Sequence, residues 1–272
     1  AQPFWQQKAL IALERMVGRI TTHWVAVSQA DRRQGIEWGL FTASKVSVVR
    51  PGIDPTAFAA RIESPERDRL RAMLGVAPDQ LLVGTVSCLK PQKSPEDFVR
   101  VAALVCQRVP AARCVLVGDG ALRPKVEALL LAQGLQDRVT LLGWRRDVAA
   151  LLKAFDVFVL TSQWEGLPCA ILEARASRIP IVATRVGGAA EAIVEGIQGT
   201  LCPAGDVRAM AERVCQILED ERFRVDLRTG TQELPEEFTI QETLKQYQSL
   251  YAYLLHATRP SEDVMKLQPN RL

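Results

Sequence analysis

An alternation of apolar strands with helical patterns over residues 81–219 limits the folds open to this chain more than any other feature. Apolar runs typical of buried strands lie near residues 81–87, 113–117, 139–143, 156–161, 180–184 and 199–202. Helical patterns follow them near residues 95–108, 121–133, 146–154, 168–178, 189–195 and 206–219. Six such units with almost continuously apolar strands are typical of an α/β fold with a doubly wound parallel sheet. Ligands of such sheets bind beyond the carboxyl ends of the strands, so the loops after the strands are the candidate sites.

The loop after the fourth strand holds two carboxylates beside a helix start. The strand leads into Glu165-Gly166-Leu167-Pro168, and Glu173 follows within the predicted helix. Pro168 suits the first turn of that helix, because its missing N–H has no intrahelical partner there. A helix start accepts phosphate or developing negative charge, and carboxylates accept hydrogen bonds from hydroxyls. A sugar nucleotide carries both a diphosphate and hydroxyls. Taken alone, Glu165 is more simply interpreted as a helix cap and Glu173 as a surface residue of the helix.

Three other loops add cations and bare backbone to the same predicted edge. Lys90, Lys93 and a predicted helix cap at Ser94 follow the first strand. Gly118-Asp119-Gly120 follows the second strand and Gly187-Gly188 the fifth, and paired glycines let the backbone approach a ligand closely. Each feature alone is compatible with a solvated lysine or a plain turn. Together on one edge they predict an anion-binding cradle.

Composition and charge argue against several other classes of function. A net charge of +3 without a basic run interleaved with aromatics argues against nucleic acid as a partner. Six cysteines without a CxxC pair and two distant histidines argue against a disulfide framework or a metal site. Nowhere are two aspartates separated by a single residue, so neither a metal for a diphosphate nor another cofactor is expected.

The chain outside the alternation is organised more loosely. A helix with a basic polar face is predicted over residues 4–20, and Ser28 is predicted to cap a helix over 29–40. Residues 50–55, with two prolines and a glycine, form the best linker. No apolar stretch reaches the about 20 residues of a membrane span. We therefore expect a cytoplasmic protein. The basic face of the helix over residues 4–20 leaves peripheral contact with the inner face of the membrane as an open alternative.

With these residues in view, the chain resembles a retaining glycosyltransferase of family 4, of the two-domain GT-B type. The resemblance rests on Glu165 and Glu173, separated by seven residues, on Lys93, and on the loops 117–120 and 186–188. It implies transfer of a sugar from a nucleotide diphosphate to an acceptor with retention of configuration. The donor is the implied partner; a lipid-linked or polysaccharide intermediate is open as the acceptor.

The resemblance also implies roles for individual residues. Glu165 would contact the donor sugar or the departing phosphate, Lys93 would neutralise the diphosphate, and Glu173 would bind the ribose hydroxyls. Loop 143–146 would border the base. Glu165 and Lys93 are thus the expected catalytic residues, and no metal is expected. The expected donor-binding residues are Glu173, Gly166, Leu167, Gly118, Arg145, Gly187, Gly188 and Lys90.

The implied fold is GT-B-like, with a Rossmann-type domain and a remnant of a second α/β domain. Residues 1–50 would be the remnant of the N-terminal acceptor domain, and residues 51–235 the donor-binding domain. Residues 236–257 would form a helix that packs back toward the N-terminal part, and residues 258–272 a frayed tail. The chain has no initiator methionine and is expected to be a fragment or a processed product.

Two departures from the family pattern keep an alternative open. Cys88 stands five residues before Lys93, where the family usually has an arginine, and the glycine-rich loop and acceptor-side histidine of the first domain are missing. A catalytically weak or inactive nucleotide-sugar binding module is therefore the second hypothesis. A Rossmann-type oxidoreductase is the third. Arg123 counts against it, because it occupies the place of the third glycine in a dinucleotide fingerprint.

Overall fold

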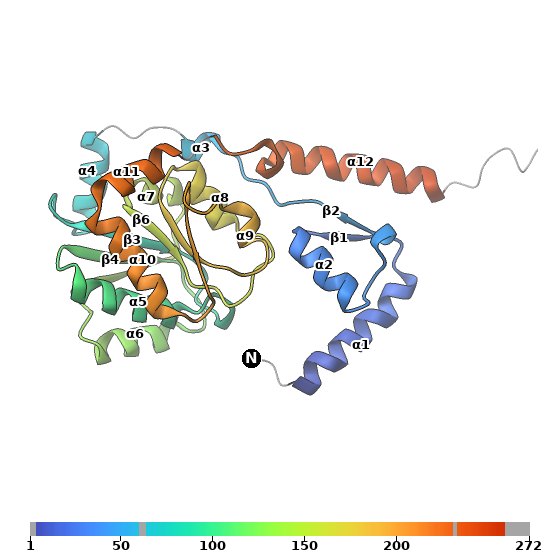
Figure 1. Ribbon diagram of the computed structural model, residues 1–272, viewed down its shortest axis with the longest axis horizontal. Helices are drawn as coiled ribbons and strands as arrows, with labels where there is room; N and C mark the ends of the chain where they lie inside the picture. Colours follow the sequence, from blue (N-terminus) through green and yellow to red (C-terminus); the bar gives the residue numbers. More distant parts are fainter. Residues whose placement is uncertain (1–3, 60–63, 231–232, 259–272) are drawn as a thin grey trace, which may run out of the picture.

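The computed structural model of the chain describes residues 4–59, 64–230 and 233–258. A larger and a smaller unit lie side by side and are connected by two segments of chain (Figure 1). The larger unit contains one parallel sheet of six strands in the order β5-β4-β3-β6-β7-β8. Its strands are β3 (Leu81–Val86), β4 (Ala112–Val117), β5 (Val139–Gly143), β6 (Val157–Leu160), β7 (Ile181–Thr184) and β8 (Gly199–Cys202). The predicted parallel sheet is confirmed, and its strand order reverses between β3 and β6.

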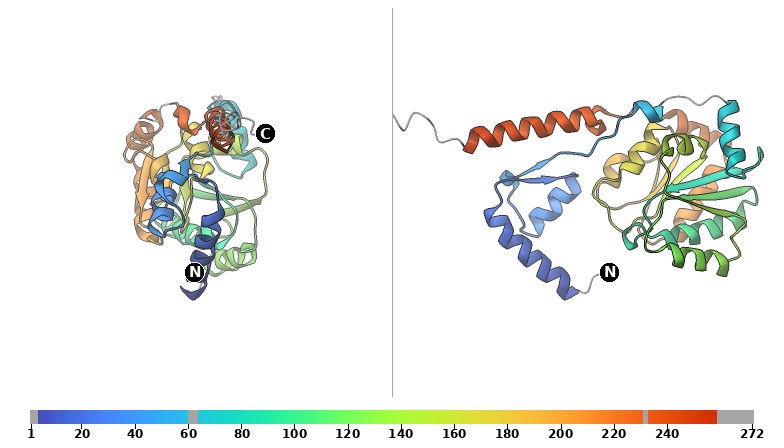
Figure 2. Two further views of the ribbon diagram at one scale, coloured as in Figure 1. Left: turned by 90° about the vertical axis from the view of Figure 1, so that its right-hand side faces the viewer. Right: turned by 180° about the vertical axis from the view of Figure 1, so that it is seen from behind.

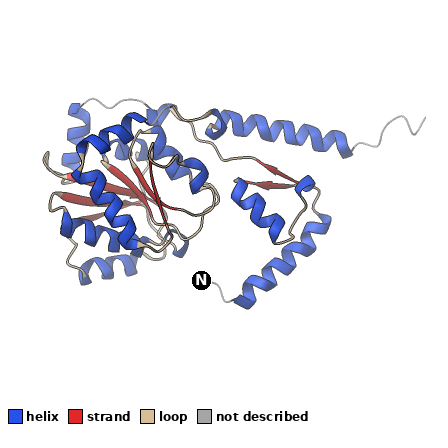
Figure 3. Cartoon of the chain, viewed as in Figure 1, coloured by secondary structure: helices blue, strands red, loops and turns tan. Residues whose placement is uncertain are grey.

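Helices cover both faces of this sheet (Figure 3). They are α4 (Ser64–Met73), α5 (Pro95–Arg108), α6 (Arg123–Ala132), α7 (Val148–Ala154), α8 (Cys169–Ala176), α9 (Ala189–Ala192), α10 (Val207–Glu219) and α11 (Glu221–Gly230). Short α3 (Thr56–Ala59), η2 (Pro91–Lys93) and η3 (Glu236–Phe238) complete the larger unit. Successive residues of a strand point to opposite faces, so Val157 packs in the core with α5 and α10, whereas Phe158 packs in the core with α7 and α8.

The elements depart from the predictions at a few places. The helix predicted over residues 189–195 is a single turn, α9, and α11 was not predicted at all. Pro168 is the residue before α8 and not its first helical residue. Ser94 precedes α5, but the predicted cap is wrong, because its hydroxyl donates to the carboxylate of Asp97 at 2.7 Å and makes no capping bond to the backbone.

The smaller unit is a parallel two-stranded sheet with helices. It consists of α1 (Phe4–Ile20), β1 (Trp24–Ala26), α2 (Gln29–Glu37), η1 (Ala43–Lys45) and β2 (Val46–Val48). The hydroxyl of Ser28 accepts a hydrogen bond from the backbone N–H of Asp31 at 3.0 Å, as predicted for the cap of α2. The assignment of this unit to an acceptor domain stays a prediction.

The two connecting segments run next to each other. Residues 50–55 lead from β2 to the larger unit, and the chain returns through residues 238–240 into α12 (Ile240–Thr258). Ile53 donates to the carbonyl of Phe238 and accepts from the N–H of Ile240, both at 3.0 Å. The predicted linker is therefore held by hydrogen bonds, and α12 extends along the side of the smaller unit in both long views (Figure 2). Most of the predicted tail, residues 259–272, lies outside the described residues.

No helix within the described ranges combines the length and the apolar content that crossing a membrane would require.

Candidate functional site

The loops after β3 and β6 meet at the carboxylate of Glu165. The ammonium of Lys93 lies 2.5 Å from Glu165 Oε1, and the hydroxyl of Ser162 donates to the same oxygen at 2.6 Å. Gln92 Nε2 lies 3.4 Å from the other oxygen, Oε2. The Glu165 side chain is only 5% exposed and that of Lys93 17%. Two of the predicted residues are thus brought together as a largely buried ion pair at the carboxyl edge of the sheet.

Hydrogen bonds between the two loops fix the position of Lys93. The hydroxyl of Thr161, at the end of β6, donates to the carbonyls of Lys93 and Ser94, each at 3.0 Å. The N–H of Gln163 donates to the carbonyl of Gln92 at 2.8 Å. Ser94 adopts a left-handed backbone with φ of 45°, which turns the chain from η2 into α5. The lysine is therefore positioned by the backbone of its neighbours before any ligand binds.

The loop after β7 closes on the same place. The N–H of Gly188 donates to the carbonyl of Gly166 at 2.6 Å. A Cβ atom added to Gly187 would lie 1.7 Å from the carbonyl oxygen of Glu165, and the φ of Gly187 is 46°. The paired glycines are thus required by the packing of one loop on the other, and their contact with a donor stays a prediction.

Glu173 lies on α8, one turn from Cys169, and shares the electrostatic surroundings of the ion pair. The pKa of the Cys169 thiol is raised, first by desolvation and then by the carboxylates of Glu173 and Glu165, while Lys93 lowers it. All three charged groups thus act on one thiol at the start of α8. Burial raises the pKa of Glu173 itself, and no described residue donates a hydrogen bond to its carboxylate. This carboxylate is an acceptor without a donor among the described residues, and its contact with ribose hydroxyls stays a prediction.

Replacing Glu173 with glutamine is expected to stabilise the free chain at neutral pH. An acid whose pKa is higher in the folded than in the unfolded state stabilises the fold while it is protonated, and this contribution is lost as the pH rises through the folded-state pKa. The melting temperature of E173Q should therefore exceed that of the native chain above the ordinary pKa of 4.5, and the two should converge below it. Thermal melts from about pH 3.5 to about pH 8, a range that brackets the ordinary pKa of a glutamate, measure this. E212Q is the control, because Glu212 is an exposed residue of α10. Equal pH profiles for both variants would contradict a raised pKa for Glu173.

A contact that the sequence did not reveal joins this edge to the smaller unit. The carboxylate of Glu191, on α9, accepts hydrogen bonds from the N–H groups of Gln29 at 3.1 Å and Ala30 at 2.8 Å. The guanidinium of Arg50 lies 2.9 Å from the same carboxylate. Glu191 therefore caps the start of α2 from another part of the chain, where the positive end of the helix favours an anion. In the sequence, only its position three residues after Gly188 connected Glu191 with the site loops.

Replacing Glu191 with glutamine is expected to loosen the start of α2. Loss of the charge should cost about 1–3 kcal/mol, the range for hydrogen bonds to ionised groups and helix ends. Hydrogen exchange of the Gln29 and Ala30 amides should accelerate accordingly. The control is E195Q, because Glu195 pairs with Arg185 while both side chains are about half exposed, at 47% and 52%. Equal acceleration in both variants would rule out a cap by Glu191.

The remaining predicted residues lie around this centre. Lys90 is exposed, directly before η2. Arg145 forms a two-pronged contact with Asp147 at 2.8 and 2.5 Å, so its guanidinium is already engaged in the free chain. A Cβ atom on Gly118 would lie 2.0 Å from the carbonyl of Ser87, so this glycine is required for the approach of two loops. Leu167 is buried beside the start of α8. Their contacts with a donor stay predictions.

Comparison with known proteins places these loops in a family. A family model described as Glycosyl transferases group 1 matches residues 66–234, which include Lys93, Glu165, Glu173 and Glu191. The match covers more than half of the chain. The chain belongs to this family. The resemblance to family 4 transferases of the GT-B type is thereby confirmed.

Curated relatives of this group 1 glycosyltransferase chain act on different sugars. The UDP-Gal:alpha-D-GlcNAc-diphosphoundecaprenol alpha-1,3-galactosyltransferase of Escherichia coli is 28% identical over 242 residues, which are 88% of this chain and 62% of that protein. The N-acetyl-alpha-D-glucosaminyl L-malate synthase of Bacillus anthracis is 31% identical over 67% of this chain and 48% of its own length. The chain spans about half the length of the curated relatives it matches.

Solved structures confirm the GT-B-like α/β fold. Anabaena Alr3699/HepE, determined in complex with UDP-glucose, matches with a TM-score of 0.76 and 27% identity, covering 85% of this chain and 64% of that one. The sucrose-phosphate synthase of Thermosynechococcus elongatus matches with a TM-score of 0.80 at 24% identity, covering 95% of this chain and 65% of that one, which shows the fold alone.

Proposed function

We propose that the loops around Glu165 bind the nucleoside diphosphate part of a sugar donor, and that the whole protein transfers the sugar with retention of configuration. One observation carries the proposal: a buried carboxylate and a lysine are held together beside a helix start, with the unpartnered Glu173 on the same helix. Such an arrangement offers positive charge to a diphosphate and acceptors to hydroxyls.

Lys93 can serve both Glu165 and the donor. An ammonium group has three donor positions, so the one directed at Glu165 leaves others for a phosphate oxygen. The first N–H groups of α8 have no partner within the helix and add to the positive field. As the bond between sugar and phosphate breaks, negative charge develops on the departing diphosphate. Cations and amides that are already in position stabilise that charge without reorganisation.

Glu173 and Glu165 are proposed to take opposite ends of the donor. Glu173 would accept hydrogen bonds from the ribose hydroxyls, which would compensate the cost of its burial. Glu165 would face the sugar or the phosphate that leaves, and Ser162 and Lys93 would keep its orientation. The acceptor is proposed to be a lipid-linked or polysaccharide intermediate. The E. coli relative, named for a diphosphoundecaprenol acceptor, supports the first of these.

Calorimetric titration of the chain with UDP, GDP and ADP tests the donor site. UDP is the first choice, because the HepE structure holds UDP-glucose and the E. coli relative is named for UDP-Gal. We expect binding of at least one nucleotide, and weaker binding by E173Q. The absence of binding for all three nucleotides would refute the proposal.

A binding module without turnover is the second candidate function. The structure favours it at one position, because Cys88 places a thiol where the family pattern has a cation and Lys90, the nearest substitute, is exposed. Release of free UDP from UDP-sugars, measured with and without added acceptor, separates the two. Binding without any release would favour the module, and steady release would exclude it.

A further inference from the structure

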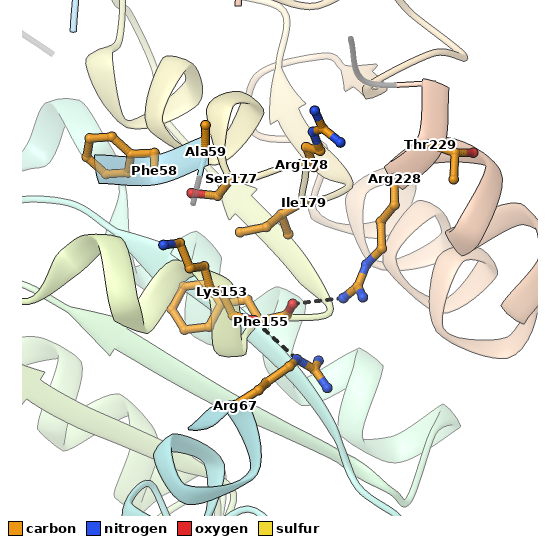
Figure 4. Close-up of a pocket in the computed structure, with 10 residues that line it drawn as sticks. All are labelled: Phe58, Ala59, Arg67, Lys153, Phe155, Ser177, Arg178, Ile179, Arg228 and Thr229. Carbon is orange, nitrogen blue, oxygen red and sulfur yellow. Dashed lines mark hydrogen bonds between the residues drawn. The ribbon is translucent and has the colours of Figure 1, made fainter. Parts of the chain in front are cut away.

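A cavity at the opposite edge of the sheet is not used by the proposed reaction. It has a volume of about 400 Å³ (Figure 4). Phe155 and Ile179, which line it, each lie two residues before a strand, β6 and β7, so the cavity is at the amino ends of the strands. Arg67 of α4, Lys153 of α7, Arg178 after α8 and Arg228 of α11 line it as well, as do Phe58, Ala59, Ser177 and Thr229. Four cationic side chains from four elements thus share one cavity, and none of these ten lining residues is acidic.

The nearby carboxylate of Asp156 does not neutralise these cations. Arg67 and Arg71 each lie 2.9 Å from it and Arg228 lies 3.3 Å from it. Lys153 donates to the carbonyl of Ala57 at 3.2 Å. Three arginines therefore share the carboxylate of Asp156, and Lys153 and Arg178 line the same cavity without contacting it, so cations outnumber carboxylates among these residues. The field of such a cluster attracts anions.

Helix ends explain only part of the cluster. The carbonyls of residues 153–155, at the end of α7, accept from Arg67 and Arg228, as Figure 4 shows for Lys153 and Phe155. Cations are favourable at a helix end. Arg178 has no such role in the described structure. It adopts a left-handed backbone with φ of 56°, which costs about 1–2 kcal/mol for a residue with a side chain.

Two polar atoms in the wall lack a partner. Nε of Arg228 and the hydroxyl of Ser177 are buried without a hydrogen bond among the described residues. Burial first and the charges of Arg67, Arg224 and Arg71 next lower the pKa of Arg228, while Asp156 opposes them. A bound anion would relieve the crowding of positive charge around Arg228.

We propose that this cavity binds the phosphate group of a small phosphorylated metabolite. A phosphate matches these cations: the guanidinium of Arg178 donates no hydrogen bond among the described residues, so it can contact a phosphate through two parallel hydrogen bonds, and the ammonium of Lys153 can add a further one. The volume corresponds to on the order of a dozen water molecules, more than a phosphate alone occupies. Phe58 and Ile179 supply apolar wall for an organic part. The site lies at the edge of the sheet opposite to the proposed donor loops and is independent of them.

Calorimetric titration of the full chain with inorganic phosphate and with glucose 6-phosphate tests the proposal. We expect one site for each probe, with the sugar phosphate bound at least as tightly. R178G should lower the affinity by about tenfold, the effect of one charge-assisted contact. The same variant should melt at an equal or higher temperature, because glycine relieves the left-handed backbone. If Arg178 had only a structural role, its replacement would not lower phosphate affinity while leaving the melting temperature unchanged or higher.

Two further variants locate the bound phosphate. R222Q removes a charge from the exposed face of α11 and should bind both probes as the native chain does. K93M removes the cation of the donor loops and should also leave this binding intact. The absence of binding, unchanged affinity in R178G, or loss of binding in K93M alone would each overturn the proposal. The last of these would assign the phosphate to the donor loops.

Discussion

Replacing Lys93 with methionine is expected to weaken UDP binding by about 10- to 100-fold. This range corresponds to the loss of one hydrogen bond between ionised groups. Methionine keeps most of the apolar stem but removes the charge that pairs with Glu165 and that is proposed to meet the diphosphate. Calorimetric titration with UDP measures the change. The matched control is K245M on α12, because Lys245 is an exposed lysine that pairs with Glu242.

The same substitution leaves a buried carboxylate unpaired, so its effect on folding has to be separated from its effect on binding. The Glu165 side chain is 5% exposed, and without Lys93 the described structure leaves it only Ser162 and Gln92 as donors. We expect K93M to melt at a lower temperature, and the double variant K93M/E165Q to recover much of that loss without recovering UDP binding. Native affinity in K93M, or in the double variant, would remove Lys93 from the donor site.

Replacing Gly187 with alanine is expected to disrupt the packing of two site loops and to cost about 3 kcal/mol or more of unfolding free energy. The new Cβ would lie 1.7 Å from the carbonyl oxygen of Glu165, so either loop has to move. The left-handed backbone adds strain of its own. Chemical denaturation measures the loss, and UDP affinity should fall with it, because Glu165 would shift away from Lys93.

Gly205 supplies the control for this substitution. Its φ is 78°, but a Cβ atom there would meet nothing within 4 Å. G205A should therefore show only the backbone strain, about 1–2 kcal/mol. If both variants lost the same stability, the contact between Gly187 and the Glu165 carbonyl would be unimportant.

The sheet and the centre of the site could be predicted because their signals are local. Runs such as 157–160 are apolar throughout, since strands buried on both faces have no polar side. Lys93 and Glu165 each follow a strand, and the parallel sheet brings such residues to one edge. The family resemblance joined these positions, and the structure places Lys93 and Glu165 in contact.

The contacts that escaped prediction join residues far apart in the chain or depend on competition between side chains. Glu191 caps a helix that begins more than 160 residues earlier, which no local pattern records. Ser94 has the right type and place for a cap, but the carboxylate of Asp97 takes its hydroxyl. Helix α11 is polar overall, with Leu227 as its one buried residue, so it lacks the apolar content that marks helices such as α5 and α10.

The pairing of the two connecting segments has a consequence for motion. Because Ile53 is hydrogen-bonded on both sides to residues 238–240, the outgoing and returning chains cannot bend separately without breaking these bonds. Bending between the two units at this point would therefore move α12 together with the smaller unit. The carboxylate of Glu191 holds both the start of α2 and Arg50, the first residue of the outgoing segment, so such a motion would disturb the α2 cap and the linker together.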